Sequence, residues 1–152
     1  MVENQSAPTS IVVPILVYAD VEKAIEWLCN AFGFAERLRV EHAGSVNHAQ
    51  LIARRSSAAG SSGAGDIMLG RQGAEFRPPR GGEVYQFVHV TVDDVDRHFE
   101  HAKAAGARIL NVPHDLPFGE RQYTAEDPEG HRWVFSQHVA DVAPQQWGAR
   151  LA

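Results

Sequence analysis

The stretch IVVPILVYADVEKAIEWLCNAFGF (residues 11–34) decides the fold, because an apolar, β-branched run leads directly into an amphipathic segment that ends near a glycine. Residues 11–18 predict a buried strand, and Pro14 within them indicates a bulge or an edge position. Asp20 is a suitable N-cap, the apolar residues after it recur at helical spacing, and Gly33 stops the helix. The stretch therefore predicts a strand followed by a helix.

Three more strands are predicted in the first half of the chain. Residues 34–43 and 45–54 lie on either side of Gly44 and predict a hairpin. Residues 56–65, SSAAGSSGAG, hold no side chain that can build a core, and they predict a mobile loop. Residues 66–70 predict a short strand. The first half therefore has the order βαβββ.

The second half repeats this order. Residues 85–92, YQFVHVTV, predict a strand, Asp93 or Asp94 offers a helix cap, and Gly106 ends the helix 73 residues after Gly33. Three strand signals follow, and the turn sequence DPEG separates the last two: residues 107–112, 119–126 and 131–139. We therefore expect an α+β fold of two βαβββ modules that form a cup-shaped mixed sheet with the helices outside, the free face lining a cavity.

These signals also divide the chain. We expect one paired-βαβββ domain over residues 11–138, with a first module at 11–70, a connector at 71–83 and a second module at 84–138. Residues 1–10 are polar and predict a flexible arm. Residues 139–152 predict a tail with a short helix, for which Pro144 is a suitable first residue.

Composition excludes several classes of function. Among the 152 residues, 14 are Lys or Arg and 19 are Asp or Glu, so the net charge is −5, and the basic residues form no stripe. Nucleic-acid affinity comes mainly from phosphate neutralisation, so we expect no nucleic-acid partner. No apolar run approaches the length of a membrane span, so we expect no membrane partner. The single cysteine, Cys29, and the absence of a signal peptide predict a cytoplasmic protein.

Three segments carry a family resemblance. VPILVYADVEKAIEWLCNAFGF (13–34), FVHVTVDDVDRHFEHAKAAGA (87–107) and FGERQYTAEDPEGHRWVFSQH (118–138) resemble the vicinal oxygen chelate superfamily, which contains glyoxalase I, extradiol dioxygenases and bleomycin-resistance proteins. The resemblance implies a paired-module cup and a homodimer. It implies no single activity, because the superfamily hosts several chemistries.

In the metal-using members of this superfamily, four His, Glu or Gln ligands lie on the first and last strand of each module. The resemblance places these positions at Val13, Met68, Phe87 and Val134. Valine and phenylalanine offer no donor atom, and a lone thioether does not hold Zn, Ni, Fe or Mn. We therefore expect no metal and no cofactor, and the implied glyoxalase or dioxygenase activity does not carry over.

Histidines are the main candidates for chemistry. His89 follows Phe87 by two residues, so it shares a strand face with it, and His48 lies on a strand of the first module. Each is either a hydrogen-bonding or proton-transfer group in the cup or a core histidine bound to backbone. His98 and His101 share a helix face, which we expect to be solvated.

Other side chains complete the candidate site. Arg121 and Tyr123 share a strand face; Arg121 either binds a ligand carboxylate or forms a structural ion pair with Glu126, Asp127 or Glu129. Trp133 and Phe135 flank Val134 and predict core residues on the helix side. The predicted ligand-binding set is His48, Gln50, Met68, Phe87, His89, Arg121, Tyr123 and Val134.

Three functions remain open from the sequence. The first is metal-independent binding of a small apolar or aromatic molecule, such as an antibiotic or a metabolite, in the manner of the bleomycin-resistance proteins that the chain resembles. The second is an enzyme: either a metal-free lyase or isomerase in which His89 or His48 acts as acid or base, or an enzyme whose metal is held by residues outside the four expected positions. The third is an interaction domain with a filled cup.

Overall fold

The computed structural model of the chain describes residues 6–8, 10–55, 63–84 and 86–151. Parts of the predicted arm and loop, residues 1–5, 9 and 56–62, lie outside the described residues. In the described part of the chain, the first module consists of β1 (Ile15–Tyr18), α1 (Val21–Phe32), β2 (Ala35–His42), β3 (Ser45–Arg55) and β4 (Gly63–Arg71). The second module is β5 (Phe87–Thr91), α2 (Val95–Ala104), β6 (Arg108–Asp115), β7 (Glu120–Glu126) and β8 (Arg132–His138).

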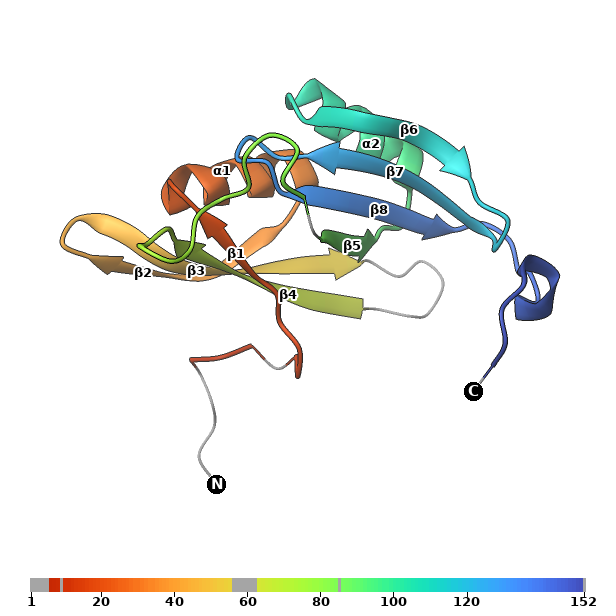
Figure 1. Cartoon of the computed structure of the whole chain (residues 1–152), viewed down its shortest axis with the longest axis horizontal. Coiled ribbons are helices and arrows are strands. Elements are labelled where there is room, and N and C mark those ends of the chain that lie inside the picture. Colours follow the sequence, from red (N-terminus) through yellow and green to blue (C-terminus); the bar gives the residue numbers. More distant parts are fainter. Residues whose placement is uncertain (1–5, 9, 56–62, 85, 152) are drawn as a thin grey trace.

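Each module folds into its own four-stranded mixed sheet (Figure 1). The strand orders are β1-β4-β3-β2 and β5-β8-β7-β6, so the two sheets have the same topology. The first strand of each module pairs in parallel with the last, and the remaining pairs are antiparallel. The predicted α+β fold of two βαβββ modules is therefore confirmed.

The predicted helix signals are confirmed at residue level. The Asp20 side chain accepts a hydrogen bond from the Lys23 amide at 3.1 Å, and Gly33 ends α1 with a φ of +72°. Of the two candidate caps of α2, Asp94 is the one used, since it accepts from the Arg97 amide at 2.9 Å. In the tail, Pro144 opens the short 3-10 helix η1 (Pro144–Trp147).

Two strand boundaries differ from the prediction. β1 begins only at Ile15, because Pro14 has no amide hydrogen to donate, although its carbonyl still accepts from the Met68 amide at 2.9 Å. β4 begins at Gly63 rather than at residue 66, since residues 63–65 pair with the end of β3. Backbone pairing thus extends a strand into small residues of weak β propensity.

The two modules share one hydrophobic core on the helix side of both sheets. Phe32 of α1 packs against Phe135 and Trp133 of β8, with ring centroids 4.7 Å and 5.4 Å apart. Both β8 side chains are completely buried, as predicted. Each helix covers one face of its own sheet and also contacts the other helix, so α1 and α2 lie at the junction of the modules (Figure 1).

His98 corrects part of the prediction of a solvated helix face, whereas His101 is exposed as predicted. His98 is partly buried, and its Nε2 donates to the Phe32 carbonyl at 3.1 Å. His101 Nε2 donates to the Asn30 carbonyl at 2.7 Å. Their face of α2 is turned toward α1 because the helices pack on each other.

The turn between β7 and β8 fastens the second module to the first strand. The Tyr18 hydroxyl donates to Asp127 at 2.7 Å, and the Ala19 amide donates to Glu129 at 2.9 Å. Next to these bonds, His131 Nε2 donates to the Val17 carbonyl at 2.7 Å. Among the described residues, no helix is long and apolar enough to span a membrane.

Candidate functional site

The strand registers define one open face on each sheet, on the side away from the shared core. In the first sheet, Leu16 and Tyr18 are buried toward the helix, whereas Ile15 is 59% exposed. Met68 lies beside Ile15 on one side and beside Gln50 on the other. His48 lies on the same face, beside Gly70.

The open face of the second sheet follows the same alternation. Phe87 is 54% exposed, and His89 lies beside Val134 in the parallel pair of β5 and β8. Val134 in turn lies beside Thr124 of β7. Of the predicted ligand-binding residues, the register therefore places Phe87, His89 and Val134 on the open face of the second sheet. It places His48, Gln50 and Met68 on the open face of the first sheet.

The four positions that the resemblance assigns to metal ligands do not offer the donors that a divalent ion needs; Val13 lies just before β1, and the other three lie on the open faces. Val13, Met68, Phe87 and Val134 supply hydrocarbon and one thioether. In the part of the chain that the structure describes, no group of three His, Cys, Asp or Glu side chains comes together to hold a metal ion. The residues at these positions therefore do not fit the metal used by the metal-binding members of the superfamily that the chain resembles.

Tyr123 and Arg121 do not lie on the open face, which corrects their place in the ligand set. Tyr123 is completely buried on the helix side, where its hydroxyl contacts His98. Arg121 lies two residues before Tyr123 and therefore points to the same side of β7. It pairs with Asp96 of α2 at 3.0 Å and with Asp115 at 2.9 Å. The structural ion pair is therefore the correct alternative for Arg121, although its partners differ from the predicted ones.

Gln50 is covered by the beginning of the chain. It is only 3% exposed, its Nε2 donates to the Ser6 carbonyl at 2.9 Å, and its Oε1 accepts from Arg37. Arg37 also donates to the Ala7 carbonyl at 3.3 Å. Residues near the N-terminus thus lie over part of the first open face, and Gln50 holds them there.

The structure adds a polar network that the sequence analysis missed. Ser136 is completely buried; its hydroxyl donates to Glu120 at 2.7 Å and accepts from Gln122 at 3.2 Å. The Gln122 amide also lies 3.5 Å from His89 Nε2. The alternation of Glu120, Gln122 and Thr124 in the predicted strand 119–126 is the signal that could have placed these side chains on the open face.

Glu120 is the charged end of this network. Burial opposes its ionisation, but hydrogen bonds from Ser136 and His138 hold the pKa of its carboxyl below the usual value. His138 lies between Asp141 and Glu120, at 2.7 Å and 2.9 Å, and hydrogen bonds to these two carboxylates raise the pKa of its imidazole. A negative group thus lies at one end of the second open face.

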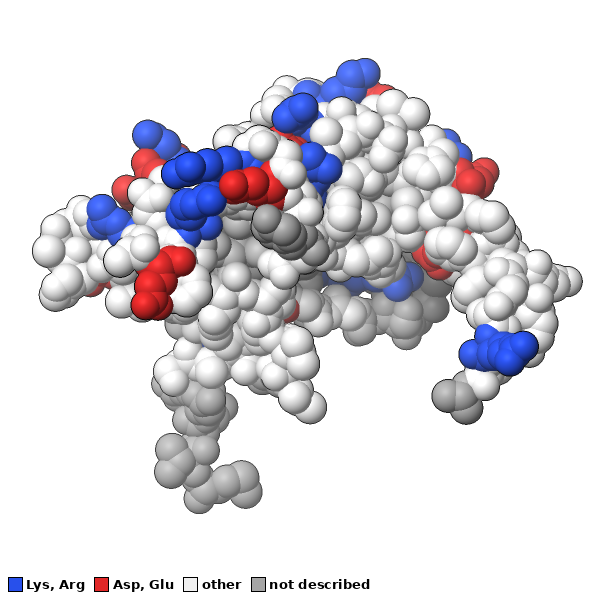
Figure 2. All heavy atoms as spheres, viewed as in Figure 1, with Lys and Arg blue, Asp and Glu red and all other residues white. Residues whose placement is uncertain are grey.

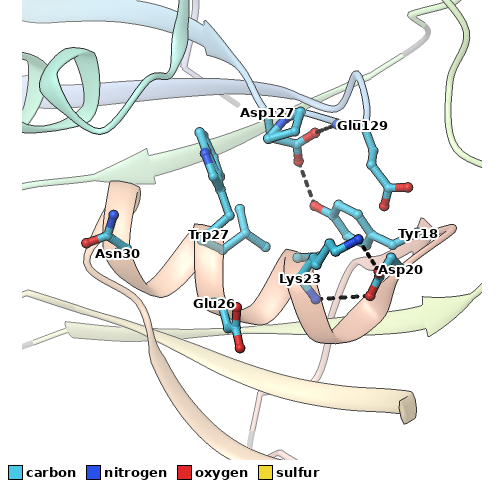
Figure 3. A pocket seen from close by; sticks show the side chains of 11 residues that line it. Tyr18, Asp20, Lys23, Glu26, Trp27, Asn30, Asp127 and Glu129 are labelled. Carbon is cyan, nitrogen blue, oxygen red and sulfur yellow. Dashed lines mark hydrogen bonds and ion pairs between the residues drawn. The ribbon is translucent and has the colours of Figure 1, made fainter. Parts of the chain in front are cut away.

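Of two hollows in the structure, one is lined by His89 of the open face, and the other lies on the helix side. His89 lines a cavity of about 380 Å³ together with Val88, Val90 and, from β4, Asp66. A larger groove of about 660 Å³ lies between α1 and the turn that joins β7 to β8 (Figure 3). This groove is on the helix side, so it is separate from the open faces.

The surface charge agrees with the composition. Figure 2 shows basic and acidic side chains intermixed over the face that it presents, with wide uncharged areas between them. Several of the basic residues are paired with carboxylates, as Arg39 is with Glu36 at 2.7 Å. On the face shown, the charges form no basic stripe of the kind that follows a phosphate backbone.

Two βαβββ modules with the same sheet order define a glyoxalase-like fold. The chain belongs to the Glyoxalase/Bleomycin resistance protein/Dioxygenase superfamily, whose family model matches residues 10–135. The uncharacterized protein Mb0911c of Mycobacterium bovis is 32% identical over 130 residues, which cover 85% of this chain and 84% of that protein.

Solved structures agree with this assignment. TioX from Micromonospora sp. ML1 is 38% identical, with a TM-score of 0.65 over 86% of this chain and 99% of that one. A glyoxalase/bleomycin resistance protein/dioxygenase from Nocardioides is 16% identical, with a TM-score of 0.60 over 96% of this chain and 91% of that one. The Nocardioides likeness is one of fold.

Proposed function

We propose that the protein binds a small apolar or aromatic molecule on its open sheet faces without a metal, and thereby sequesters an antibiotic or a metabolite. The observation that carries this proposal is the apolar character of Val13, Met68, Phe87 and Val134, the four positions that the family resemblance assigns to metal ligands. Such side chains favour burial of an apolar ligand.

The apolar and polar residues of the faces have separate roles in this proposal. Phe87, Met68 and Val134 contact the body of the ligand, since burial of apolar area and aromatic contact supply most of the affinity. His48, His89 and Gln122 orient the ligand through hydrogen bonds at the edge of its apolar contact surface. Arg121 and Tyr123 have no direct role, because they lie on the opposite face.

We further propose that two copies form a homodimer in which open faces of the two copies enclose the ligand. In a single chain, Ile15 on the first open face and Phe87 on the second are 59% and 54% exposed, and exposed large apolar side chains favour a partner. A closed dimer would remove both the exposed apolar area and the solvent around the ligand. The lone Cys29 is compatible with work in the reducing cytoplasm.

The decisive experiment is a thermal-shift screen of aromatic natural products, carried out with and without EDTA and followed by calorimetry of the hits. A ligand of the native state raises the melting temperature, and the shift should persist in EDTA. Phe87→Ala and His89→Ala should weaken binding while the protein stays folded. Phe76→Ala is the matched control, because Phe76 is also exposed but lies in the connector.

Two outcomes would contradict the proposal. One is a stoichiometric divalent ion in protein purified without chelators, together with loss of binding in EDTA. The other is an unchanged affinity in both face variants alongside a collapse of their folding, which would make Phe87 and His89 structural residues.

One observation favours an enzyme as the second candidate. His89 lies next to an ordered chain of Gln122, Ser136 and Glu120, and such a chain can hold an imidazole in one orientation for proton transfer. A metal-free lyase or isomerase would convert its ligand during calorimetry. Product detected by mass spectrometry with the wild-type protein, but not with His89→Ala, would favour this alternative.

A further inference from the structure

The groove between α1 and the turn at residues 127–130 has no role in the proposed function. Its volume of about 660 Å³ lies within the range of small-molecule sites, and it lies behind the first sheet rather than on the open face. Side chains of α1 form one wall, and the turn forms the other (Figure 3). A molecule bound here would not compete with a ligand on the open faces.

The wall formed by the turn is rigid. Asp127 is 3% exposed, and its carboxylate accepts from the Tyr18 hydroxyl at 2.7 Å and from Trp133 Nε1 at 3.1 Å. It also accepts from the backbone amides of Glu129 and His131. Asp127 is therefore fully engaged by the protein, and the groove is preformed rather than assembled by a ligand.

The α1 wall provides an aromatic surface. Trp27 is half-buried and packs edge-on against Phe32, with ring centroids 4.9 Å apart. Figure 3 shows its indole rising from the helix toward the turn. Ala24, Leu28 and Pro128 add apolar surface beside it. An indole in a partly dry groove attracts cations to its ring face as well as apolar groups.

Charges in the groove favour a cation. Lys23 is paired with Asp20 at 3.1 Å, and its side chain is 83% exposed, so solvent screens its charge. Glu129 accepts from the Ala19 amide at 2.9 Å and 3.1 Å, and among the described residues no Lys or Arg lies within ion-pair distance of it. Burial raises the pKa of this carboxyl, as is usual for a partly desolvated acid without a cation.

We propose that this groove is a second ligand site, and that it binds an organic ammonium ion whose apolar part packs on Trp27 and whose charge pairs with Glu129. Glu26 also lines the groove, but its side chain points away from Asp127 and Trp27 in Figure 3, whereas Glu129 lies on the turn, next to Asp127 and Tyr18. A fixed turn, an indole and one carboxylate without a cation together select this ligand class.

The test is a titration with benzyltrimethylammonium chloride at constant ionic strength, followed through the indole N–H resonances of the three tryptophans. The Trp27 resonance should shift and saturate, whereas that of the buried Trp133 should move little. Benzylsulfonate has a similar shape and the opposite charge, so it should produce no saturable shift. The His89→Ala variant should respond like the wild type, because the open face is not involved.

Two matched variants identify the carboxylate. Glu129→Gln keeps an acceptor for the Ala19 amide and should weaken binding of the cation about tenfold. Glu22→Gln makes the same charge change on α1 outside the groove and should leave affinity unchanged. The proposal is overturned by a Trp27 resonance that does not saturate, by an equal response to the sulfonate, or by equal losses in the two variants. If Glu129→Gln does not fold, the wild-type protein still tests whether the groove selects a cation, through the comparison of benzyltrimethylammonium with benzylsulfonate.

Discussion

Tyr123 in β7 and His98 in α2 are joined by a hydrogen bond of 2.7 Å between the phenol oxygen and Nδ1. The direction of this bond follows from the other ring nitrogen. Because the Phe32 carbonyl can only accept, Nε2 carries the proton, and Nδ1 accepts from the Tyr123 hydroxyl. One neutral imidazole thus connects a strand of the second module with the end of α1 in the first.

Replacing this imidazole should loosen the junction of the modules. His98→Ala leaves the buried Tyr123 hydroxyl and the Phe32 carbonyl without their partner, so we expect the free energy of unfolding to fall by about 2–3 kcal/mol. Urea denaturation measures this change. His101→Ala removes one more exposed bond and should cost only about 0.5–1 kcal/mol. Equal losses in the two variants would contradict the assigned role of His98.

The same residue predicts a pH dependence of stability. Burial lowers the pKa of His98 in the folded protein, so the unfolded chain takes up a proton first as the pH falls. The stability contributed by the neutral imidazole is therefore present above about pH 6.5 and is lost as the pH falls below that value. Urea midpoints between about pH 7 and pH 5.5 should decrease in the wild type and decrease less in His98→Gln.

Asp127 should be among the most sensitive positions of the chain. Asp127→Asn offers fewer acceptors to the Tyr18 hydroxyl, Trp133 Nε1 and two backbone amides, so we expect a loss of about 3 kcal/mol. Thermal and urea unfolding both measure this loss. Glu26→Gln is the control, because Glu26 is exposed, and it should change stability by less than about 0.5 kcal/mol.

Gly119 should tolerate no side chain. Its φ is +85°, and a Cβ atom would lie 1.8 Å from the Ala140 carbonyl oxygen. The Gly119 carbonyl also accepts from the amides of Val139 and Ala140, which fastens the tail to the second module. Gly119→Ala should detach residues 139–151, which limited proteolysis with mass spectrometry would detect. Gly73→Ala, which meets no atom within 4 Å, should leave the cleavage pattern unchanged.

The proposed dimer makes a prediction for Phe87. A carboxylate in place of this exposed ring would be buried in the interface without a partner, so Phe87→Glu should convert the dimer to a folded monomer. Light scattering after size exclusion measures the mass. Phe76→Glu places the same charge on another exposed phenylalanine and should leave the mass unchanged. A wild-type protein that is already monomeric would refute the dimer.

The sequence was sufficient to predict the modules because their signals are local. The cap at Asp20, the stop at Gly33 and the core positions Trp133 and Phe135 all follow from short-range patterns, and the structure confirms them. Alternation also placed His89 on the same face as Phe87. In β7 the same alternation was assigned to the wrong face, so Arg121 and Tyr123 were predicted to bind ligand although they lie on the helix side.

Features that depend on which element packs on which were not predictable in this way. Arg121 was paired with neighbours in sequence, but its partners are Asp96 and Asp115, which the packing of α2 and β6 brings near. His98 was predicted to face solvent, because local sequence does not show that α1 packs against this side of α2. The groove beside Trp27 requires a turn that lies far away in the chain, so no short-range pattern could reveal it.

The bonds from the turn at residues 127–131 to Val17, Tyr18 and Ala19 have a consequence for biosynthesis. Tyr18 of the first strand leaves the ribosome 109 residues before its partner Asp127. Until the turn has been synthesised, its bonds to the first strand cannot form, and the apolar side of α1 lacks the second sheet that covers it. We therefore expect the two halves, though built alike, to mature as one cooperative unit rather than one after the other.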